Sequence, residues 1–375
     1  MAPVCWEPDF GEWILTRWSD CQTVLRDPRF SSNLAHSSAP MQGPVEMLRA
    51  STSRVLLFID PPDHTRLRGL VSQAFTPRRI EAMRSRVEAI VGEIFDKVAS
   101  GATGTMDLMA DLAQPLPVIV ICELLGVPVE DHEKFGPWSS AASRLLDGDL
   151  DEETMMRSLA GAAELITYFQ ELFQRRRDDP ADDLLTALVQ AEAEGDRLDE
   201  EELMSITVLL FIAGHETTSN LIGNGTLALL RHPQQAARLL ERADDQAFVR
   251  NAVEELLRFD PPVQLTGRFA TTDLEVAGVP IAKGEAVVTV VAAANRDPEH
   301  YALPERLDLE RPDPHHLGFS QGIHYCLGAA LARLEGEVVF PALLRRYPSL
   351  RLATDTPTYR DHRVLRGLAA LPVTW

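Results

Sequence analysis

Cysteine and basic residues are both scarce in this chain. Its 375 residues include four cysteines, and no two of them form a CxxC pair, which argues against a zinc site and against a disulfide framework. Lys and Arg number 36 against 56 Asp and Glu, which gives a formal net charge of −20. Because binding to phosphates needs a basic surface, we expect no nucleic-acid partner.

The chain also lacks a long hydrophobic run. Apolar stretches such as 286–294 are much shorter than the roughly 20 residues that cross a bilayer, and no basic segment precedes an apolar run at the start. The apolar fraction of 45% is ordinary for a globular protein with a large core. We therefore expect a cytoplasmic protein with no membrane partner, whose acidity serves solubility.

One stretch, residues 316–330, concentrates the features that chemistry needs. Glycines interrupt the segment before Cys326, and an apolar-periodic helix is predicted over 327–340. A thiol at a helix N-terminus is favoured as the thiolate, which is either a metal ligand or a nucleophile. A nucleophile would need a base, for which His324 is the local candidate. Gly328 instead leaves the backbone open to something large and flat.

A ten-residue pattern in this stretch resembles the haem-binding loop of the cytochrome P450 superfamily: Phe319-x-x-Gly322-x-His324-x-Cys326-x-Gly328. The resemblance implies a mainly α-helical fold with a small β-rich lobe, a single domain over 1–375 that encloses haem b. It also implies that Cys326 is the axial thiolate ligand of the iron and that the other four residues of the pattern bind the cofactor. Ser320 stands where bacterial members usually carry glycine, and the segment before the first strand is shorter than is usual.

A helix without internal proline is predicted over 199–231. Its middle is unusual, since glycine, an acid and two threonines interrupt an apolar run and weaken the helix. The sequence AGHETT resembles the oxygen-activation segment of the family. This implies that Glu216 and Thr217 are catalytic and that Ala213 and Gly214 contact the haem. The alternative is a structural kink, in which threonine hydroxyls bond backbone carbonyls.

Basic side chains in two places match the residues that bind the haem propionates in the family. His64 and Arg68 are four apart in the segment DPPDHTRLR, so on a helix they project from one face, where they could hold a carboxylate. Arg268, in a predicted strand, resembles the second propionate-binding arginine. Without the resemblance, each of these residues would be interpreted as an exposed charge.

A third set of charged residues is predicted to be structural. Glu255 and Arg258 are three apart on a predicted helix that ends before a Pro-Pro pair. They resemble the ExxR pair of the family, and Arg311 matches the arginine that completes this triad. The resemblance implies that the three residues hold the core and take no part in the chemistry.

The resemblance implies oxygen activation and oxidation of an organic substrate. Thiolate donation to the iron favours O–O cleavage, and Glu216 with Thr217 would supply the protons that this cleavage consumes. No GxGxxG fingerprint for flavin or nicotinamide is present. Electrons from NAD(P)H would therefore arrive through a ferredoxin reductase and a ferredoxin. A peroxide-driven enzyme would typically carry an arginine in place of the acid and alcohol, and residues 213–218 contain none.

Two other classes of protein compete with a monooxygenase. A haem protein without turnover, such as a ligand sensor or binding protein, would need Cys326 but neither Glu216 nor Thr217. A protein that used Cys326 as a nucleophile would purify without haem.

Apolar residues at the predicted pocket positions indicate a hydrophobic substrate, such as a macrolide, terpenoid or aromatic product of secondary metabolism. These positions are Leu57, Val208, Phe211, Ile212, Val263, Leu265 and Leu365. Basic residues in two segments are expected to flank the face behind the cysteine loop and to dock an acidic ferredoxin. They are Arg66, Arg78, Arg79, Arg333, Arg345 and Arg346.

The remaining elements are predicted from caps, prolines and alternation. Capping boxes are expected at Ser19 with Gln22 and at Asp199 with Glu202. Further helices are expected over 19–25, 76–99, 115–125 and 251–259, and as a pair within 130–177 that is broken at 147–149. Strands are expected over 11–17, 265–270, 274–276 and 286–291. The long loop 33–54 corresponds, by the resemblance, to a substrate-access loop.

Overall fold

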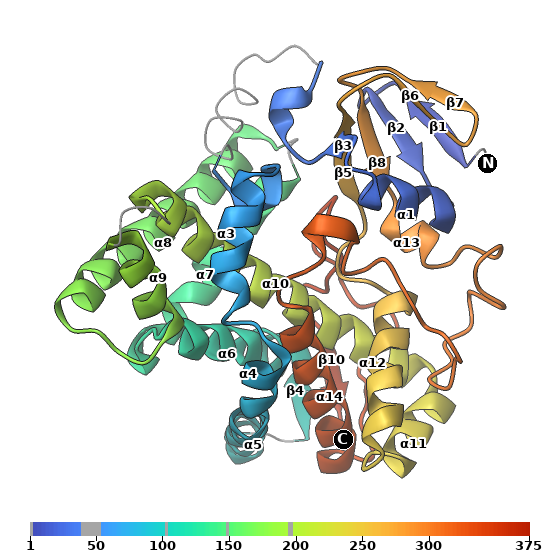
Figure 1. Cartoon of the computed structure of the whole chain (residues 1–375). Coiled ribbons are helices and arrows are strands. Elements are labelled where there is room, and N and C mark those ends of the chain that lie inside the picture. Colours follow the sequence, from blue (N-terminus) through green and yellow to red (C-terminus); the bar gives the residue numbers. More distant parts are fainter. Residues whose placement is uncertain (1–2, 39–53, 102–103, 148–149, 194–197) are drawn as a thin grey trace.

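The longest helix, α10 (Glu200–Arg231), runs through the middle of the molecule (Figure 1). Its start is the predicted capping box. The Glu202 amide donates to Asp199 Oδ1 at 2.8 Å, and the Asp199 amide donates to Glu202 Oε2 at 3.1 Å, so two amides that the helix cannot pair internally are satisfied. This computed structural model describes residues 3–38, 54–101, 104–147, 150–193 and 198–375.

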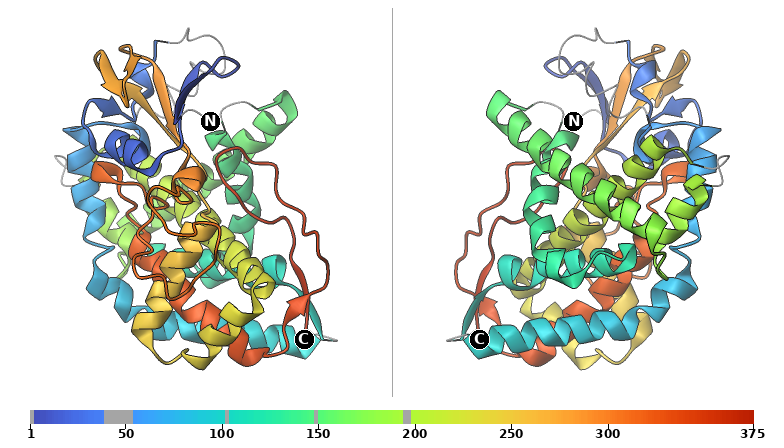
Figure 2. Two further views of the ribbon diagram at one scale, coloured as in Figure 1. Left: turned by 90° about the vertical axis from the view of Figure 1, so that its right-hand side faces the viewer. Right: turned by 90° about the vertical axis from the view of Figure 1, so that its left-hand side faces the viewer.

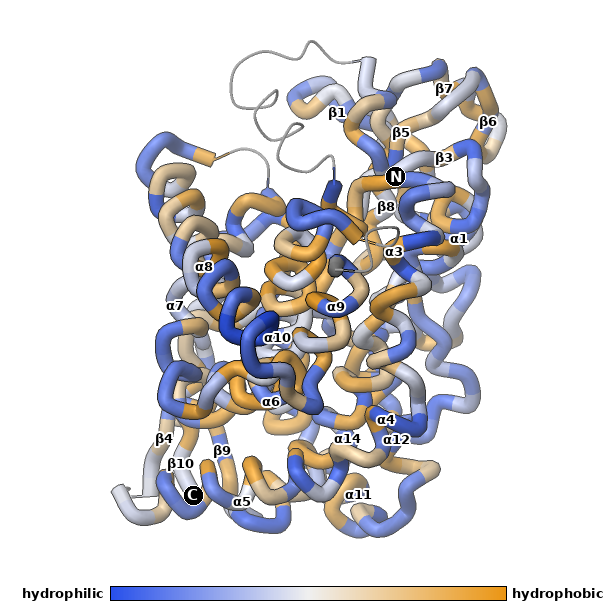
Figure 3. Tube along the Cα trace, turned by 60° about the vertical axis from the view of Figure 1, so that its left-hand side comes forward, coloured by the Kyte–Doolittle hydropathy of each residue, from blue (hydrophilic) through white to orange (hydrophobic). Residues whose placement is uncertain are grey.

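Other helices pack on α10 or on the helices and turns beside it. The core gathers buried side chains from helices on several sides of α10, and apolar residues are dense along α6 in Figure 3. These helices are α3 (Asp63–Ser72), α4 (Pro77–Ala82), α5 (Arg84–Gly101), α6 (Pro115–Leu125), α7 (His132–Ser143), α8 (Glu152–Asp178), α9 (Leu184–Ala193), α11 (Pro233–Glu241), α12 (Gln246–Phe259) and α14 (Ala329–Arg346). A short π-helix, Met109–Ala113, precedes α6.

A small β-rich lobe lies beside the helices (Figure 1). Its five-stranded sheet has the order β1-β2-β8-β5-β3, in which β2 and β8 are parallel and the other neighbours antiparallel. The strands are β1 (Val4–Glu7), β2 (Glu12–Leu15), β3 (Phe30–Ser31), β5 (Thr266–Ala270) and β8 (Ala286–Thr289), and the lobe also contains α1 (Trp18–Arg26), α13 (Val291–Ala294) and the pair β6 (Leu274–Val276) and β7 (Val279–Ile281). A mainly α-helical fold with a β-rich lobe is therefore confirmed.

A second, three-stranded sheet has the order β4-β10-β9, with β4 at Thr105–Asp107, β9 at Arg351–Leu352 and β10 at Pro372–Thr374. Between β9 and β10 the chain makes a long excursion along the side of the helices (Figure 2). The end of this excursion is a hairpin, because Tyr359 pairs with Leu368 in an antiparallel bridge. A further bridge joins Leu365 to Val263, ahead of β5.

The structure brings Glu255, Arg258 and Arg311 together in the interior. Arg258 Nε donates to Glu255 Oε2 at 2.7 Å, and Arg258 Nη2 donates to Oε1 at 2.9 Å. Arg311 Nε reaches the same Oε2 at 3.0 Å. Arg258 also donates to the backbone oxygens of Asn295 and Pro304, so this buried charge network fastens α12 to the segment that leads to the cysteine loop.

Two predicted elements differ from the structure, and a third lies mostly outside the described residues. Helix α1 begins at Trp18 and has no side-chain cap, so the box predicted at Ser19 is absent; instead the Trp18 amide donates to Asp297 Oδ2 at 2.8 Å. The predicted helix 76–99 is two helices that separate at Met83, where neither proline nor glycine marks the break. Most of the predicted loop 33–54 lies outside the described residues. None of the described helices has the length and apolar character needed to span a bilayer.

Candidate active site

The loop before α14 places Cys326 just ahead of Gly328, the N-cap of that helix. The Cys326 amide donates to Phe319 O at 2.9 Å, which closes the loop. Gly322 has a φ of +67°, and a Cβ there would lie 2.6 Å from Leu25 O in α1, so glycine is required at this turn. At Gly328 a Cβ would meet nothing within 4 Å, so this stretch of backbone is open to a ligand.

Burial of Cys326 acts against its predicted thiolate state when no metal is bound. Burial raises the pKa of the thiol, and it outweighs the amides of Gly328 and Ala329 and the charges of Arg68 and Arg333, which act in the opposite direction. The helix N-terminus therefore contributes as expected, but desolvation is the larger effect. A bound cation would reverse the balance, because a thiol that coordinates a metal loses its proton.

Polar side chains from three segments meet beside the cysteine loop. The rings of His64, on α3, and His324 lie 4.5 Å apart between centroids. Arg68 Nη2 donates to Tyr325 O at 2.6 Å, and Arg268, on β5, is 4% exposed. The structure thus unites the residues that the sequence predicted to bind propionates with the histidine of the cysteine loop.

Arg268 is a buried cation whose hydrogen bonds go to neutral groups. Its Nη1 donates to Gly267 O at 2.7 Å and to Thr266 Oγ1 at 3.2 Å. No carboxylate forms an ion pair with it within the described parts of the chain. Burial lowers the pKa of Arg268 to about 10, against the charge of Asp60. A buried charge without a counter-ion is unfavourable, so this site favours an anionic ligand.

The same positive surroundings act on His324. Burial, followed by the charges of Arg268, His64 and Arg68, lowers the pKa of His324 to about 3, so the ring is neutral near pH 7. Its Nε2 lies 2.6 Å from Ser32 Oγ, a partner that no sequence pattern indicated. This contact fixes the ring beside the cluster.

These residues fit the haem that the resemblance implies. Its two carboxylates would supply the negative charge that Arg268 and Arg68 lack, and His64 Nε2 is a buried polar atom without a hydrogen-bond partner among the described residues. The open backbone at Gly328 would accommodate a flat ring system. The Cys326 sulfur is a soft donor of the kind that binds haem iron.

The middle of α10 carries a buried acid. Glu216 is 1% exposed and forms an ion pair with Arg360, whose Nη1 contacts Glu216 Oε1. Its other oxygen, Oε2, has no hydrogen-bond partner in the part of the chain that the structure describes. The Thr217 hydroxyl donates to Ala213 O at 2.8 Å, which is the bond that the structural alternative requires. That bond does not account for a buried carboxylate paired with an arginine.

The predicted pocket positions divide into two groups on α10. Val208 and Ile212 keep some exposed surface, and so do Leu209 and Ala213 between and beside them. Phe211 is fully buried on the opposite face of the helix, where its ring centroid lies 4.7 Å from that of Phe135. Phe211 therefore does not share the less buried face of α10, which Leu209 does share with Val208 and Ile212.

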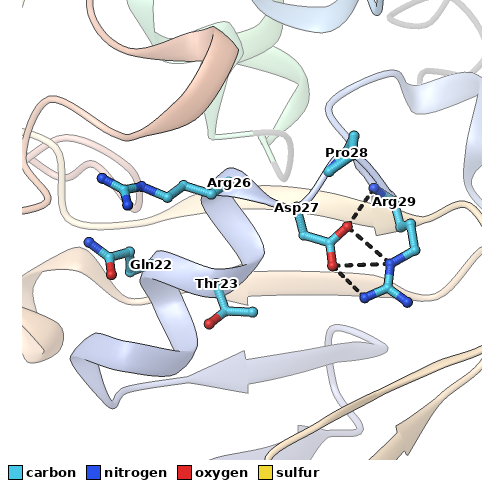
Figure 4. Close-up of a pocket in the computed structure, with 6 residues that line it drawn as sticks. All are labelled: Gln22, Thr23, Arg26, Asp27, Pro28 and Arg29. Carbon is cyan, nitrogen blue, oxygen red and sulfur yellow. Dashed lines mark hydrogen bonds and ion pairs between the residues drawn. The ribbon is translucent and has the colours of Figure 1, made fainter.

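Of the other pocket positions, Leu57 is 38% exposed and Leu365 is 3% exposed. Leu57 lies in the short 3-10 helix Leu56–Phe58. The segment just before β5 contains Val263 and Leu265. None of the predicted site residues lines the open hollow at the end of α1, which Figure 4 shows with its lining residues Gln22, Thr23, Arg26, Asp27, Pro28 and Arg29.

Comparison with known proteins gives consistent matches over nearly the whole chain. The family model described as Cytochrome P450 matches residues 33–371. The chain is 43% identical to vitamin D(3) 25-hydroxylase of Pseudonocardia autotrophica over 373 residues, which are 98% of this chain and 89% of that protein. It is 42% identical to 6-deoxyerythronolide B hydroxylase of Saccharopolyspora erythraea, covering 96% and 89%. The ligand-free structure of CYP164A2 from Mycobacterium smegmatis has a TM-score of 0.90 at 40% identity and covers 99% of this chain and 93% of that one.

Proposed function

The chain belongs to the cytochrome P450 family and is a haem-dependent monooxygenase, and we propose that Cys326 supplies the protein ligand to its iron. The observation that carries this proposal is the buried cation Arg268, which has no described counter-ion and lies in one cluster with His324, two residues before the cysteine. Arg68, Arg268 and His64 would hold the propionates. Haem bound there would activate O2 for insertion of one oxygen atom into a substrate.

We propose further that Glu216 and Thr217 handle the protons of this reaction. Glu216 is held through Oε1 by Arg360, which leaves Oε2 able to bind a water. The Thr217 hydroxyl donates a hydrogen bond to Ala213 O. Its oxygen lone pairs stay free to accept a hydrogen bond from a water or from a bound ligand. Together the two side chains would pass protons from the buried carboxyl group of Glu216 to the exposed face of α10 at Ala213.

The substrate that we propose is a hydrophobic molecule. Support comes from the apolar, incompletely buried face of α10 at Val208, Leu209 and Ile212. The two relatives named above are hydroxylases of vitamin D(3) and of 6-deoxyerythronolide B, and hydroxylation of a comparably apolar compound is the reaction that we expect here.

An acidic ferredoxin is the proposed electron donor. Of the six predicted docking arginines, four form ion pairs with the chain's own carboxylates: Arg66, Arg333, Arg345 and Arg346. Arg78 and Arg79 are exposed on α4, which packs against α14, and have no ion pair within the described residues. Replacing both by Glu should slow electron transfer at low salt; unchanged rates would remove these two residues from the docking surface.

Substitution of Thr217 separates a role in proton delivery from a purely structural kink. In a system reconstituted with ferredoxin and reductase, Thr217→Val should retain haem and bind substrate. The amount of product formed per NAD(P)H consumed should fall, because proton delivery no longer follows its normal route. Thr218→Val, which removes a neighbouring buried hydroxyl, is the matched control and should keep its coupling. Glu216→Gln should slow the whole reaction by about 10² to 10⁴, the usual worth of a general acid or base. Full coupling in Thr217→Val together with an unchanged rate in Glu216→Gln would contradict the proposal and favour a purely structural kink.

A further inference from the structure

We infer that Arg360 is a positioning residue for Glu216, and that Asp147 acts on the same carboxylate by holding the turn 360–364. The inference deepens the proposed function and rests on the role proposed there for Glu216. It concerns a link between the end of α7 and the interior of α10 that no sequence pattern marks.

Arg360 provides the positive charge at Glu216. The acid is 1% exposed and the Arg360 side chain 15% exposed. His215 Nδ1 lies 3.9 Å from Glu216 Oε2. Burial lowers the pKa of His215 to about 4. The charge of Glu216 acts in the opposite direction, and the charge of Arg360 adds to the effect of burial. The imidazole is thus neutral near pH 7, and among the described residues the guanidinium is the charged partner of this acid.

The ion pair also determines which carboxylate oxygen is available. Arg360 Nη1 contacts Oε1, whereas Oε2 has no hydrogen-bond partner in the described chain. Because an unpaired buried oxygen is unfavourable, Oε2 is the atom at which a water would be bound. Loss of the arginine would let the carboxylate rotate and would leave the negative charge without its partner.

Arg360 is carried by a hairpin that is fixed to α10. The Arg360 amide donates to Gly367 O at 2.9 Å across the hairpin. Gly367 lies so close to Asn220 that a Cβ would come within 1.8 Å of its Oδ1. Asn224 Nδ2 donates to Arg366 O at 3.0 Å. These contacts fix the position of the hairpin on α10, one to two helical turns after Glu216.

Asp147 holds the turn of this hairpin through hydrogen bonds and an ion pair. It follows the short helix Arg144–Leu146 at the end of α7. The amides of Arg363 and Val364 both donate to its Oδ1 at 3.0 Å. His362 Nδ1 lies 3.1 Å from Oδ2, and both side chains are 4% exposed. Although burial raises the pKa of Asp147, His362 and the Val364 amide outweigh it, so the pKa is lowered. The contacts of Asp147 with the turn therefore favour its ionised form.

Helix α7 in turn covers the ion pair. Arg360 Nη1 lies 3.5 Å from Ser140 Oγ, and Ser139 Oγ lies 2.9 Å from His215 Nδ1. Asp147 holds the end of α7 against the hairpin. The position of α7 on the hairpin therefore determines which side chains lie next to the Arg360 guanidinium. Asp147 is expected to influence Glu216 through this contact and through the turn that carries Arg360.

The test compares substitutions at both residues in the haem-loaded, reconstituted enzyme. Arg360→Gln should lower the product rate by about tenfold to a hundredfold, the cost of misplacing a catalytic group by about 1 Å, while substrate affinity changes little. Arg360→Lys should restore much of the rate, and Asp147→Ala should act in the same direction as Arg360→Gln with a smaller effect. Asp361→Asn is the matched control, since Asp361 is exposed in the same turn and has no ion pair in the described chain.

A double variant distinguishes positioning from a general loss of stability. If Arg360 acts through Glu216, the Glu216→Gln, Arg360→Gln enzyme should be no slower than Glu216→Gln alone. An additive loss would overturn the inference. So would wild-type rates in Arg360→Gln and Asp147→Ala when Glu216→Gln is slow, whereas a fast Glu216→Gln enzyme would overturn the proposed role of Glu216 itself. Should Arg360→Gln fail to fold, Asp147→Ala combined with Glu216→Gln provides the same comparison.

Discussion

The rings of His64 and His324 lie 4.5 Å apart, although one belongs to α3 and the other to the loop of Cys326. This contact joins two segments that are remote in sequence and places Arg68 where it can donate to Tyr325 O. The cluster is rich in donors and poor in acceptors, so its stability depends on the anion that binds it. That dependence can be measured at Arg268.

Replacing Arg268 should have opposite effects with and without haem. In Arg268→Gln the propionates lose a buried cation, so haem should dissociate faster in a transfer assay to a haem-scavenging protein. The haem-free variant should unfold at the same or a higher denaturant concentration than the haem-free wild type, because an unpaired buried charge has been removed. Arg29→Gln, at an exposed arginine paired with Asp27, is the control. Equal haem dissociation rates in Arg268→Gln and wild type would show that this residue does not bind the cofactor.

The pair of Glu255 and Arg258 should carry far more stability than its spacing suggests. Both side chains are fully buried, so Glu255→Gln should lower the free energy of unfolding by about 3 to 5 kcal/mol, the cost of breaking a buried pair. Glu241→Gln breaks a pair of the same spacing with Arg238, whose side chains are 66% and 52% exposed, and should change stability by less than about 1 kcal/mol. Denaturant unfolding measures both. Similar losses in the two variants would contradict a structural role for the buried pair.

Ser320 occupies a backbone conformation that glycine adopts more easily. Its φ is +58°, and its hydroxyl is buried without a hydrogen-bond partner among the described residues. Ser320→Gly should therefore raise the stability of the haem-loaded protein by about 0.5 to 1 kcal/mol despite the greater entropy of glycine in the unfolded chain. Gly278→Ser, at an open turn with a φ of +81°, gives the cost of placing serine in this region of backbone space. A lower melting temperature for Ser320→Gly would contradict the expectation.

The behaviour of Glu254 predicts a specific acid sensitivity. Burial opposes its ionisation, but His316 and Arg333 outweigh burial and lower the pKa of Glu254 to about 2. His316 Nδ1 accepts from the Gly318 amide at 3.0 Å, so its proton is on Nε2, 3.3 Å from the carboxylate. A carboxyl with a lowered pKa stabilises the fold above its ordinary pKa of about 4.5 and loses that contribution as the pH falls toward 2.

The stability difference between wild type and Glu254→Gln should therefore be full above about pH 5 and should shrink as the pH falls from there toward 2. Denaturant midpoints measured at several pH values give this difference directly. Because Arg333 also contacts Tyr325 Oη and lies over the Phe319 ring, the cysteine loop should loosen over the same range. A difference that does not depend on pH would mean that the Glu254 carboxylate does not stabilise the loop.

The sequence predicted those parts of the molecule whose information is local. The loop of Cys326 is a continuous pattern, and the start of α10 is encoded by two residues three apart, Asp199 and Glu202. The pair of Glu216 and Arg360 could not be predicted, because its members are 144 residues apart and no motif marks the arginine. Distance along the chain, more than the chemistry of the residues, limited what could be inferred.

Periodicity and cap signals had limits of their own. The apolar run of α10 does not tell which of its faces is the less buried one, and Phe211 in that run packs on Phe135. The division between α4 and α5 at Met83 has no helix-breaking residue, since it follows from how the two helices pack. The pKa of Cys326 depends on burial as well as on the helix N-terminus, and burial is a property of the fold.

The central claim is that Cys326 binds the haem iron as a thiolate, and the absorption spectrum of the reduced, carbon monoxide-bound protein tests it most directly. We expect the strongly red-shifted Soret band of thiolate-ligated haem in the wild type. In Cys326→His, haem should be retained by the unchanged cluster of His64, Arg68 and Arg268, and the Soret band should move to the position of histidine-ligated haem. A red-shifted band that persists in Cys326→His, or its absence from the haem-loaded wild type, would contradict the assignment.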